Sequence, residues 1–278
     1  MAEIILIEYY TKMYGENFYS RRDALKMAAF VALTGIGGFN DSAFGLGSSG
    51  APRVLLQVHL KGGNDALNTI VPYRSERYYR DRPGLAIEPN MVLPMTGTLG
   101  FNPALSLIAD RYRAGNVAVL LGTGIPEQTK SHWRASQILF SGNNSGIGMS
   151  NWFEVGLQAQ NSAIRTKNLA LSFDEAEGAD KLYHLIDKAL DPEFNVLLVR
   201  IELEGFDTHF KQKAVHGQNL KVLSELVDGV HRRFDTSCKS FELLSILVSE
   251  FGRGIAENED GGTDHGEAGC CFLIGRSV

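Results

Sequence analysis

The C-terminal part of the chain contains an adjacent aspartate and histidine between glycines, within the run Gly261–Gly266. A carboxylate oxygen and an imidazole nitrogen suit hard-to-borderline divalent metal ions, and glycine lets the backbone pass close to an ion. A polar loop that follows a strand is the plainer interpretation of the same pattern. The pair Asp264-His265 therefore predicts a metal site only if other segments bring further ligands to the same place.

Other polar clusters also follow apolar runs that resemble strands. They are Asn64-Asp65, the segment Thr123–His132, Asp207-Thr208-His209 and the pair Asp264-His265. In parallel sheets the ligand site lies beyond the carboxyl ends of the strands, so clusters that follow several strands are expected to meet at one edge. The order and position of these clusters predict a metal site at that edge.

Short apolar runs alternate with segments of helical periodicity. The expected strands are Arg53–Leu60, Val117–Leu121, Asn195–Leu203, Phe241–Val248 and Cys270–Ile274, and the expected helices are Pro103–Ala114, Leu182–Leu190 and Phe210–Phe234. Strands separated by helices indicate an α/β protein with a mostly parallel sheet covered on both faces. We expect a three-layer α/β/α sandwich.

The composition narrows the class of protein. The chain has 278 residues, and 44% of them are apolar, which is enough for a large core. Its formal net charge is −5. The positive charge is not gathered into a patch, so nothing predicts a nucleic-acid partner. Cys270 and Cys271 fall in an apolar run and Cys238 in a polar loop, which indicates structural thiols rather than a disulfide framework or a metal cluster.

The N-terminal segment has the features of an export signal. The pair Arg21-Arg22 precedes a weakly apolar stretch, Met27–Gly38, and small and polar residues follow it. This pattern predicts a twin-arginine (Tat) signal and linker over 1–50, a single α/β domain over 51–278, the Tat translocase as partner and a periplasmic or extracellular location. The apolar stretch is too short for a permanent membrane span. An amphipathic first helix is the alternative.

Several unusual strings in this chain occur together and in a characteristic order. They are Lys61–Tyr73 (KGGNDALNTIVPY), Tyr79–Leu85 (YRDRPGL), Ser131–Trp133 (SHW), Gly205–His209 (GFDTH), Ser249–Arg253 (SEFGR) and Gly261–Gly266 (GGTDHG). In these motifs the chain resembles the DUF1501 proteins, a Tat-exported family of unassigned function. The resemblance runs from about Val54 to Gly275. The family is similar in motif order to the alkaline phosphatase and sulfatase superfamily.

The resemblance implies an alkaline phosphatase-like fold with two metal ions. Carried over residue by residue, it implies that Asp65, Asp264 and His265 hold one metal, with the hydroxyl of Ser131 directed at it as catalytic nucleophile. Two ions a few ångströms apart can activate a nucleophile and neutralise the leaving oxygen in an in-line displacement on phosphorus or sulfur. A turn-forming Asp65 and an ordinary helix N-cap at Ser131 are the structural alternatives.

The same resemblance implies part of a second metal site and contacts to the substrate. Asp207 with His209 or His216 would hold the second ion, although His216 could face solvent instead. His132 is expected to contact the substrate, and a metal-ligand role fits it equally well. Arg253 is expected to meet a substrate anion, with neutralisation of a neighbouring glutamate as the alternative.

Two classes of function remain open from the sequence. The first is an exported metal-dependent hydrolase of small anionic phosphate or sulfate esters, with Zn, Mn, Mg or Ca as the metal. The second is a non-catalytic exported binding or assembly protein with a degenerate metal site. The short stretch between Trp152 and Asn195 and the end of the chain at Val278, soon after the Asp-His pair, favour an incomplete second site.

Overall fold

The computed structural model describes residues 53–124, 130–141, 165–172, 178–191, 193–236 and 242–276, and the contacts below are those of these residues. The expected twin-arginine segment with its linker and Cys238 lie outside the described ranges. Within the described ranges, no helix has both the length and the apolar character that a membrane crossing requires.

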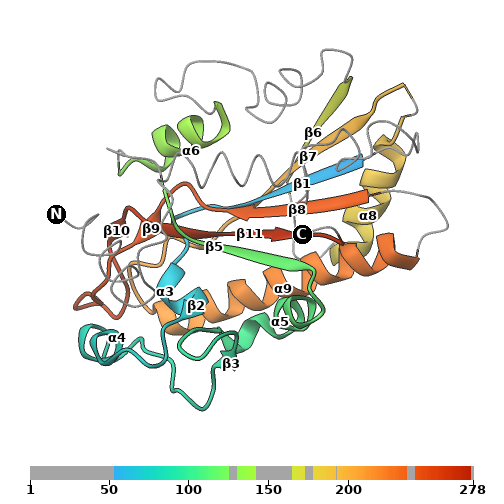
Figure 1. Ribbon diagram of the computed structural model, residues 1–278. Helices are drawn as coiled ribbons and strands as arrows, with labels where there is room; N and C mark the ends of the chain where they lie inside the picture. The colour runs from blue at the N-terminus through green and yellow to red at the C-terminus, as the bar shows by residue number, and fades with distance from the viewer. Residues whose placement is uncertain are drawn as a thin grey trace, which may run out of the picture.

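A mixed, mostly parallel sheet forms the centre of the molecule (Figure 1). Its strand order is β5 (Val117–Thr123), β11 (Gly269–Ile274), β8 (Glu242–Val248), β1 (Arg53–Leu60), β7 (Val196–Leu203) and β6 (Thr166–Ser172). Strand β1 pairs in parallel with β7 and β8, and β6 pairs in parallel with β7. Strand β11 runs antiparallel between β8 and β5. The expected α/β class and mostly parallel sheet are confirmed.

The two faces of the sheet bury two separate apolar clusters. In β1, Val54, Leu56 and Val58 point into the larger cluster because side chains alternate along a strand. Helices α5 (Ser106–Arg113), α8 (Gly178–Ala189) and α9 (Gln212–Thr236) cover this face (Figure 1). In the described residues, α6 (His132–Ser141) lies over the opposite face, where its Leu139 joins the smaller cluster.

Helix α9 shows why the larger face is stable. Leu220, Leu223, Val227 and Val230 recur at helical spacing, and each is fully buried against the sheet. Burying such a side chain stabilises the fold by about 2 kcal/mol. The anchored helix begins directly after the loop that follows β7, so it fixes that loop.

The adjacent cysteines confirm the expected alternation in β11. Cys270 packs in the larger cluster and Cys271 in the smaller one, and both are buried free thiols. They point to opposite faces of the strand, so they serve the two cores separately.

Short elements complete the carboxyl end of the parallel strands. They are α3 (Ala66–Thr69), α4 (Glu76–Asp81), the 3-10 helix η1 (Pro103–Leu105), the small sheet of β2 (Ile70–Val71), β4 (Gly100–Phe101) and β3 (Leu93–Pro94), and the two-stranded ladder of β9 (Gly252–Arg253) and β10 (His265–Gly266). The β9–β10 ladder pairs His265 with Arg253 and thereby brings the predicted Asp-His pair back to the sheet.

Candidate metal centre

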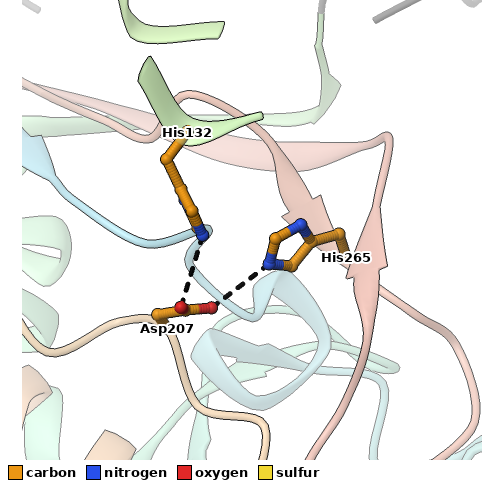
Figure 2. Close-up of side chains that lie close together, drawn as sticks. All are labelled: His132, Asp207 and His265. Atoms are coloured by element: carbon orange, nitrogen blue, oxygen red, sulfur yellow. Dashed lines mark hydrogen bonds and ion pairs between the residues drawn. The ribbon is translucent and has the colours of Figure 1, made fainter. Parts of the chain in front are cut away.

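Three side chains from distant segments converge at the carboxyl end of the parallel strands. His132 begins α6, Asp207 lies in the loop after β7, and His265 lies in β10; one ligand atom from each falls within 4.8 Å of the other two (Figure 2). A fourth residue, His209, joins them: its Nε2 lies 3.1 Å from Asp207 Oδ1 and 3.0 Å from His265 Nε2. We call these four residues the Asp207 cluster.

Glycines allow the loops that carry this cluster to approach one another. Gly62, which follows β1, has φ +122°, and a Cβ there would lie 2.2 Å from the backbone nitrogen of Asp207. A Cβ on Gly262 would lie 2.2 Å from the carbonyl carbon of His209. Real side chains do not approach backbone so closely, so both positions require glycine to keep Asp207 and His209 in place.

Each imidazole of the Asp207 cluster is anchored through its Nδ1 atom. The anchors are the Glu250 carboxylate for His132 at 2.9 Å, the Asp264 carboxylate for His209 at 3.4 Å, and the main-chain carbonyl of Lys130 for His265 at 3.0 Å. An oxygen acceptor at Nδ1 fixes the ring and its tautomer, as in carboxylate–histidine–metal arrangements. All three rings thus direct Nε2 toward the same place.

The Nε2 atoms meet one carboxylate. Asp207 Oδ2 lies 3.3 Å from His132 Nε2, and Asp207 Oδ1 lies 3.2 Å from His265 Nε2 (Figure 2). Burial lowers the pKa of His265, which favours the neutral ring. A carbonyl oxygen only accepts, so the neutral ring carries its hydrogen on Nδ1 and turns a lone pair from Nε2 toward Asp207. Lone pairs that face a carboxylate repel it unless a cation lies between them.

The guanidinium of Arg253 donates a hydrogen bond to the Asp207 carboxylate. Burial would raise the pKa of Asp207, but the hydrogen bond and the charge of Arg253 outweigh it and hold this pKa below its usual value. The buried guanidinium also donates to main-chain carbonyls, namely those of Gly62, Gly63, Phe206 and Thr263. The substrate contact expected of Arg253 stays a prediction, and the observed contacts make this residue an organiser of the loops.

Glu250, the second residue after β8, was not predicted as a site residue. Its carboxylate accepts from the backbone N–H of Gly62 at 2.8 Å and contacts His59 Nε2 at 3.0 Å as well as His132. Burial would raise the pKa of Glu250, but the hydrogen bonds from the two imidazoles and the charge of His59 lower it to about 2. The position of Glu250 at the same sheet edge was the available signal in the sequence.

Asp65 lies at the same end of the sheet but has other partners. Its Oδ1 accepts from the backbone N–H of Leu67 and caps α3, while its Oδ2 lies 2.5 Å from Arg82 Nη1 and also accepts from the amide of Gln212. Burial would raise the pKa of Asp65, but Arg82 outweighs it and lowers this pKa. The structure does not bring Asp65 into the Asp207 cluster, and its contacts match the turn interpretation.

His216 and Asp264 also stand apart from the centre of the cluster. His216 is buried in α9, where its Nε2 lies 2.9 Å from Asn64 Oδ1 and burial lowers its pKa to about 4. Asp264 is exposed and meets the outer nitrogen of His209. Of the predicted metal ligands, Asp207, His209 and His265 come together, His132 joins them, and Asp264 lies one contact further out.

Ser131 lies directly before α6 and next to His132. It is exposed, and its hydroxyl accepts from the backbone N–H of Arg134 at 3.5 Å. This contact agrees with the N-cap interpretation and leaves the nucleophile role a prediction.

The family described as "Protein of unknown function (DUF1501)" matches residues 188–278. This match confirms the resemblance over the C-terminal third of the chain, which carries Asp207, His209, Glu250 and His265. No protein among the curated sequences matches the chain.

Two solved structures are similar to this chain over most of its length. The C-terminal periplasmic domain of EcEptC from Escherichia coli, in a complex with Zn, is 12% identical with a TM-score of 0.45, and the similarity covers 83% of this chain and 74% of that one. The soluble domain of lipooligosaccharide phosphoethanolamine transferase A from Neisseria meningitidis is 10% identical with a TM-score of 0.47, and the coverage is 82% and 78%. At this degree of similarity, the function of this chain has to be derived from its own side chains.

Proposed function

We propose that this chain holds one divalent metal ion in the Asp207 cluster and hydrolyses a phosphate or sulfate ester there. The convergence of three anchored Nε2 atoms on the Asp207 carboxylate carries the proposal. Two imidazole nitrogens on one tetrahedral zinc ion would lie about 3.3 Å apart, given zinc–nitrogen distances of about 2.0 to 2.1 Å. The observed separation of 3.0 Å between His209 Nε2 and His265 Nε2 is close to that value.

The types of the ligand atoms also narrow the choice of metal. Three imidazoles and one carboxylate suit Zn²⁺, whereas Mg²⁺ and Ca²⁺ prefer sites made of oxygens. Manganese is the second choice, because it accepts mixed nitrogen and oxygen ligands. We therefore assign zinc as the resident ion.

An ion there would polarise a phosphoryl or sulfuryl oxygen and favour attack by an oxygen nucleophile. The start of α6 would supply the nucleophile and a binding place for the anionic substrate. The exposed hydroxyl of Ser131 adjoins His132 and serves as the nucleophile, and the positive end of the dipole of this ten-residue helix favours an anionic substrate. The substrate class is accordingly a small anionic ester.

The wider setting belongs to the same proposal. Helices over both faces of the sheet support a three-layer α/β/α arrangement of the alkaline phosphatase type. The pair Arg21-Arg22 supports export through the Tat translocase to the periplasm or beyond. Arg82 and Gln212 already contact the Asp65 carboxylate, so we propose one ion per chain instead of two.

Elemental analysis of the full chain, purified after export, tests the metal. We expect about one zinc per chain in the wild type and none in His265→Ala. A wild type that holds no metal, and that added zinc does not stabilise in a thermal melt, would refute the site.

An activity screen separates catalysis from binding. We expect hydrolysis of aryl phosphates or aryl sulfates that stops with a chelator and returns with zinc. A zinc-loaded protein that is inactive on both series would instead favour the alternative, a non-catalytic binding protein with one structural metal, which the one cluster found among the described residues also supports.

A further inference from the structure

Glu250 brings a negative charge into the interior directly behind the Asp207 cluster. Its side chain is fully buried, as is the side chain of His59 that it contacts. A buried carboxylate is costly unless donors satisfy both of its oxygens. The partners of each oxygen therefore reveal what the group is held for.

The two oxygens of Glu250 face different parts of the molecule. Oε1 receives the backbone N–H of Gly62 at 2.8 Å and lies 2.9 Å from His132 Nδ1. Oε2 lies 3.0 Å from His59 Nε2. Glu250 thus joins the loop after β1, the side chain of a β1 residue and the first residue of α6.

The contact with His132 fixes a tautomer. An ionised carboxylate only accepts, so His132 carries a hydrogen on Nδ1 and leaves the Nε2 lone pair 3.3 Å from Asp207 Oδ2. The opposite tautomer would place a lone pair against the Glu250 carboxylate. Metal binding through Nε2 needs the first tautomer, and the Glu250 contact selects it.

His59 makes this contact rigid. Its ring lies between Glu250 and Glu202, with His59 Nδ1 3.8 Å from Glu202 Oε1, and it packs edge-on against Phe140 with centroids 5.0 Å apart. Phe140 belongs to α6, so this helix is held near its C-terminal end by His59 and at its first residue by Glu250. The orientation of His132 then depends on a buried pair rather than on an exposed loop.

We infer that Glu250 is a positioning residue for the metal centre, acting through His132 with His59 as its buried support. This inference rests on the proposed metal site. It assigns a role to the buried glutamate of the Ser-Glu-Phe-Gly-Arg motif. If this inference holds, replacing Glu250 by the neutral glutamine weakens the binding of the metal ion.

The test compares two glutamate variants in the full chain. Glu250→Gln removes the charge that anchors His132, and Glu202→Gln removes the other carboxylate beside His59 without touching His132. Zinc affinity is measured by competition with a chelating dye, and His132→Ala marks complete loss of the ligand. We expect about 10-fold to 100-fold weaker zinc binding in Glu250→Gln, the range for lost outer contacts, and less than about 3-fold in Glu202→Gln.

Two spectroscopic measurements complement the affinities, and the first of them uses the unaltered protein, so it does not depend on a variant that folds. Long-range ¹⁵N–¹H spectra of the histidines should show His132 protonated at Nδ1 in the zinc-loaded wild type, and the Co²⁺ spectrum of Glu250→Gln should differ from that of the wild type. A His132 protonated at Nε2 in the loaded wild type overturns the inference, whatever the variants do.

The remaining outcomes separate this inference from the proposed function. If the wild type binds zinc and Glu250→Gln binds it equally well, Glu250 has no positioning role and the metal site stands. If the two glutamate variants lose affinity equally, the effect is general electrostatics and the inference is wrong. A wild-type protein that does not bind zinc would refute the proposed metal site itself.

Discussion

Two carboxylates at the same edge of the sheet have opposite surroundings. Asp65 follows β1 and is buried in an ion pair with Arg82, whereas Asp207 follows β7, is half exposed and faces three imidazoles. Both are aspartates within a few residues of a parallel strand, and both were expected to bind metal. The comparison shows that a position after a strand brings a carboxylate to the site, and that its neighbours decide what it binds.

The neighbours differ in whether they leave room for a cation. Arg82 is itself the cation for Asp65, and its guanidinium also donates to the carbonyls of Gly254 and Ile255. The imidazoles around Asp207 are held by acceptors at their outer nitrogens, so they present lone pairs inward. Asp65 therefore has the contacts of a structural residue, whereas Asp207 has the surroundings that the proposed metal site requires.

The largest expected effect separates these two aspartates. Asp207→Asn should lose its metal by orders of magnitude in affinity, because it removes the anionic ligand. Asp65→Asn should keep about one metal per chain and lose about 3 kcal/mol of unfolding free energy, because it leaves Arg82 buried without its counter-charge. Elemental analysis and urea unfolding of both variants measure the two effects. A folded Asp65→Asn protein without metal would restore Asp65 as a ligand.

A smaller effect is expected at Asp264, whose exposed carboxylate meets the outer nitrogen of His209 at 3.4 Å. Asp264→Asn keeps an acceptor there but loses the charge, so zinc affinity should fall about 10-fold. Stability should change by no more than about 0.5 kcal/mol, since the residue lies on the surface. Complete loss of metal from a folded Asp264→Asn protein would return this residue to the direct ligands that the family resemblance implies.

The elements of the fold could be predicted where the apolar pattern is strong. Strand β1 has the bounds Arg53–Leu60 expected for it, and α9 starts and ends two residues later than expected, because buried runs and helical stripes are local signals. Strand β6 was missed because polar residues interrupt it at the edge of the sheet. The antiparallel direction of β11 was also missed, since periodicity carries no strand direction.

The site could be predicted as a place but not as a set of contacts. The order of the polar clusters pointed to the edge of the sheet where the structure brings His132, Asp207 and His265 together. The pairing of Asp65 with Arg82 and that of His132 with Glu250 join residues 17 and 118 positions apart, and residue type and spacing do not encode them. Such pairs decide which carboxylates remain available to an ion, so the ligand set needed the structure.

His231 is a buried histidine whose hydrogen-bond partner is a serine, in contrast to the imidazoles around Asp207. His231 lies in α9 with its Nε2 2.9 Å from Ser245 Oγ, and burial, aided by Arg111, lowers its pKa to about 3. Its pKa in the unfolded chain is about 6.5, so from about pH 6.5 down to about pH 3 the unfolded state takes up a proton that the folded state refuses. Stability should therefore fall as the pH falls through this window, with a slope of up to about 1.4 kcal/mol per pH unit from this group.

His231→Gln should remove this part of the slope, because glutamine keeps a polar contact to Ser245 and does not titrate. Urea unfolding of the wild type and the variant at several pH values between about pH 4 and pH 7 measures the difference. Equal slopes in the two proteins would mean that His231 titrates normally in the folded state.

A small change in stability is also expected at Ser131, which directly precedes His132 at the start of α6. Its cap contact to Arg134 is long, at 3.5 Å, so Ser131→Ala should cost no more than about 1 kcal/mol and leave the zinc content unchanged. If the hydroxyl is also the nucleophile of the proposed reaction, the same variant loses ester hydrolysis while it stays folded and loaded with zinc. Thr is the matched control, since Ser131→Thr keeps a hydroxyl and a cap. Zinc content, a thermal melt and the rate on an aryl phosphate or sulfate, measured on all three proteins, separate the two roles. An alanine variant that hydrolyses the ester as fast as the wild type would leave Ser131 a helix cap and assign the attack to water.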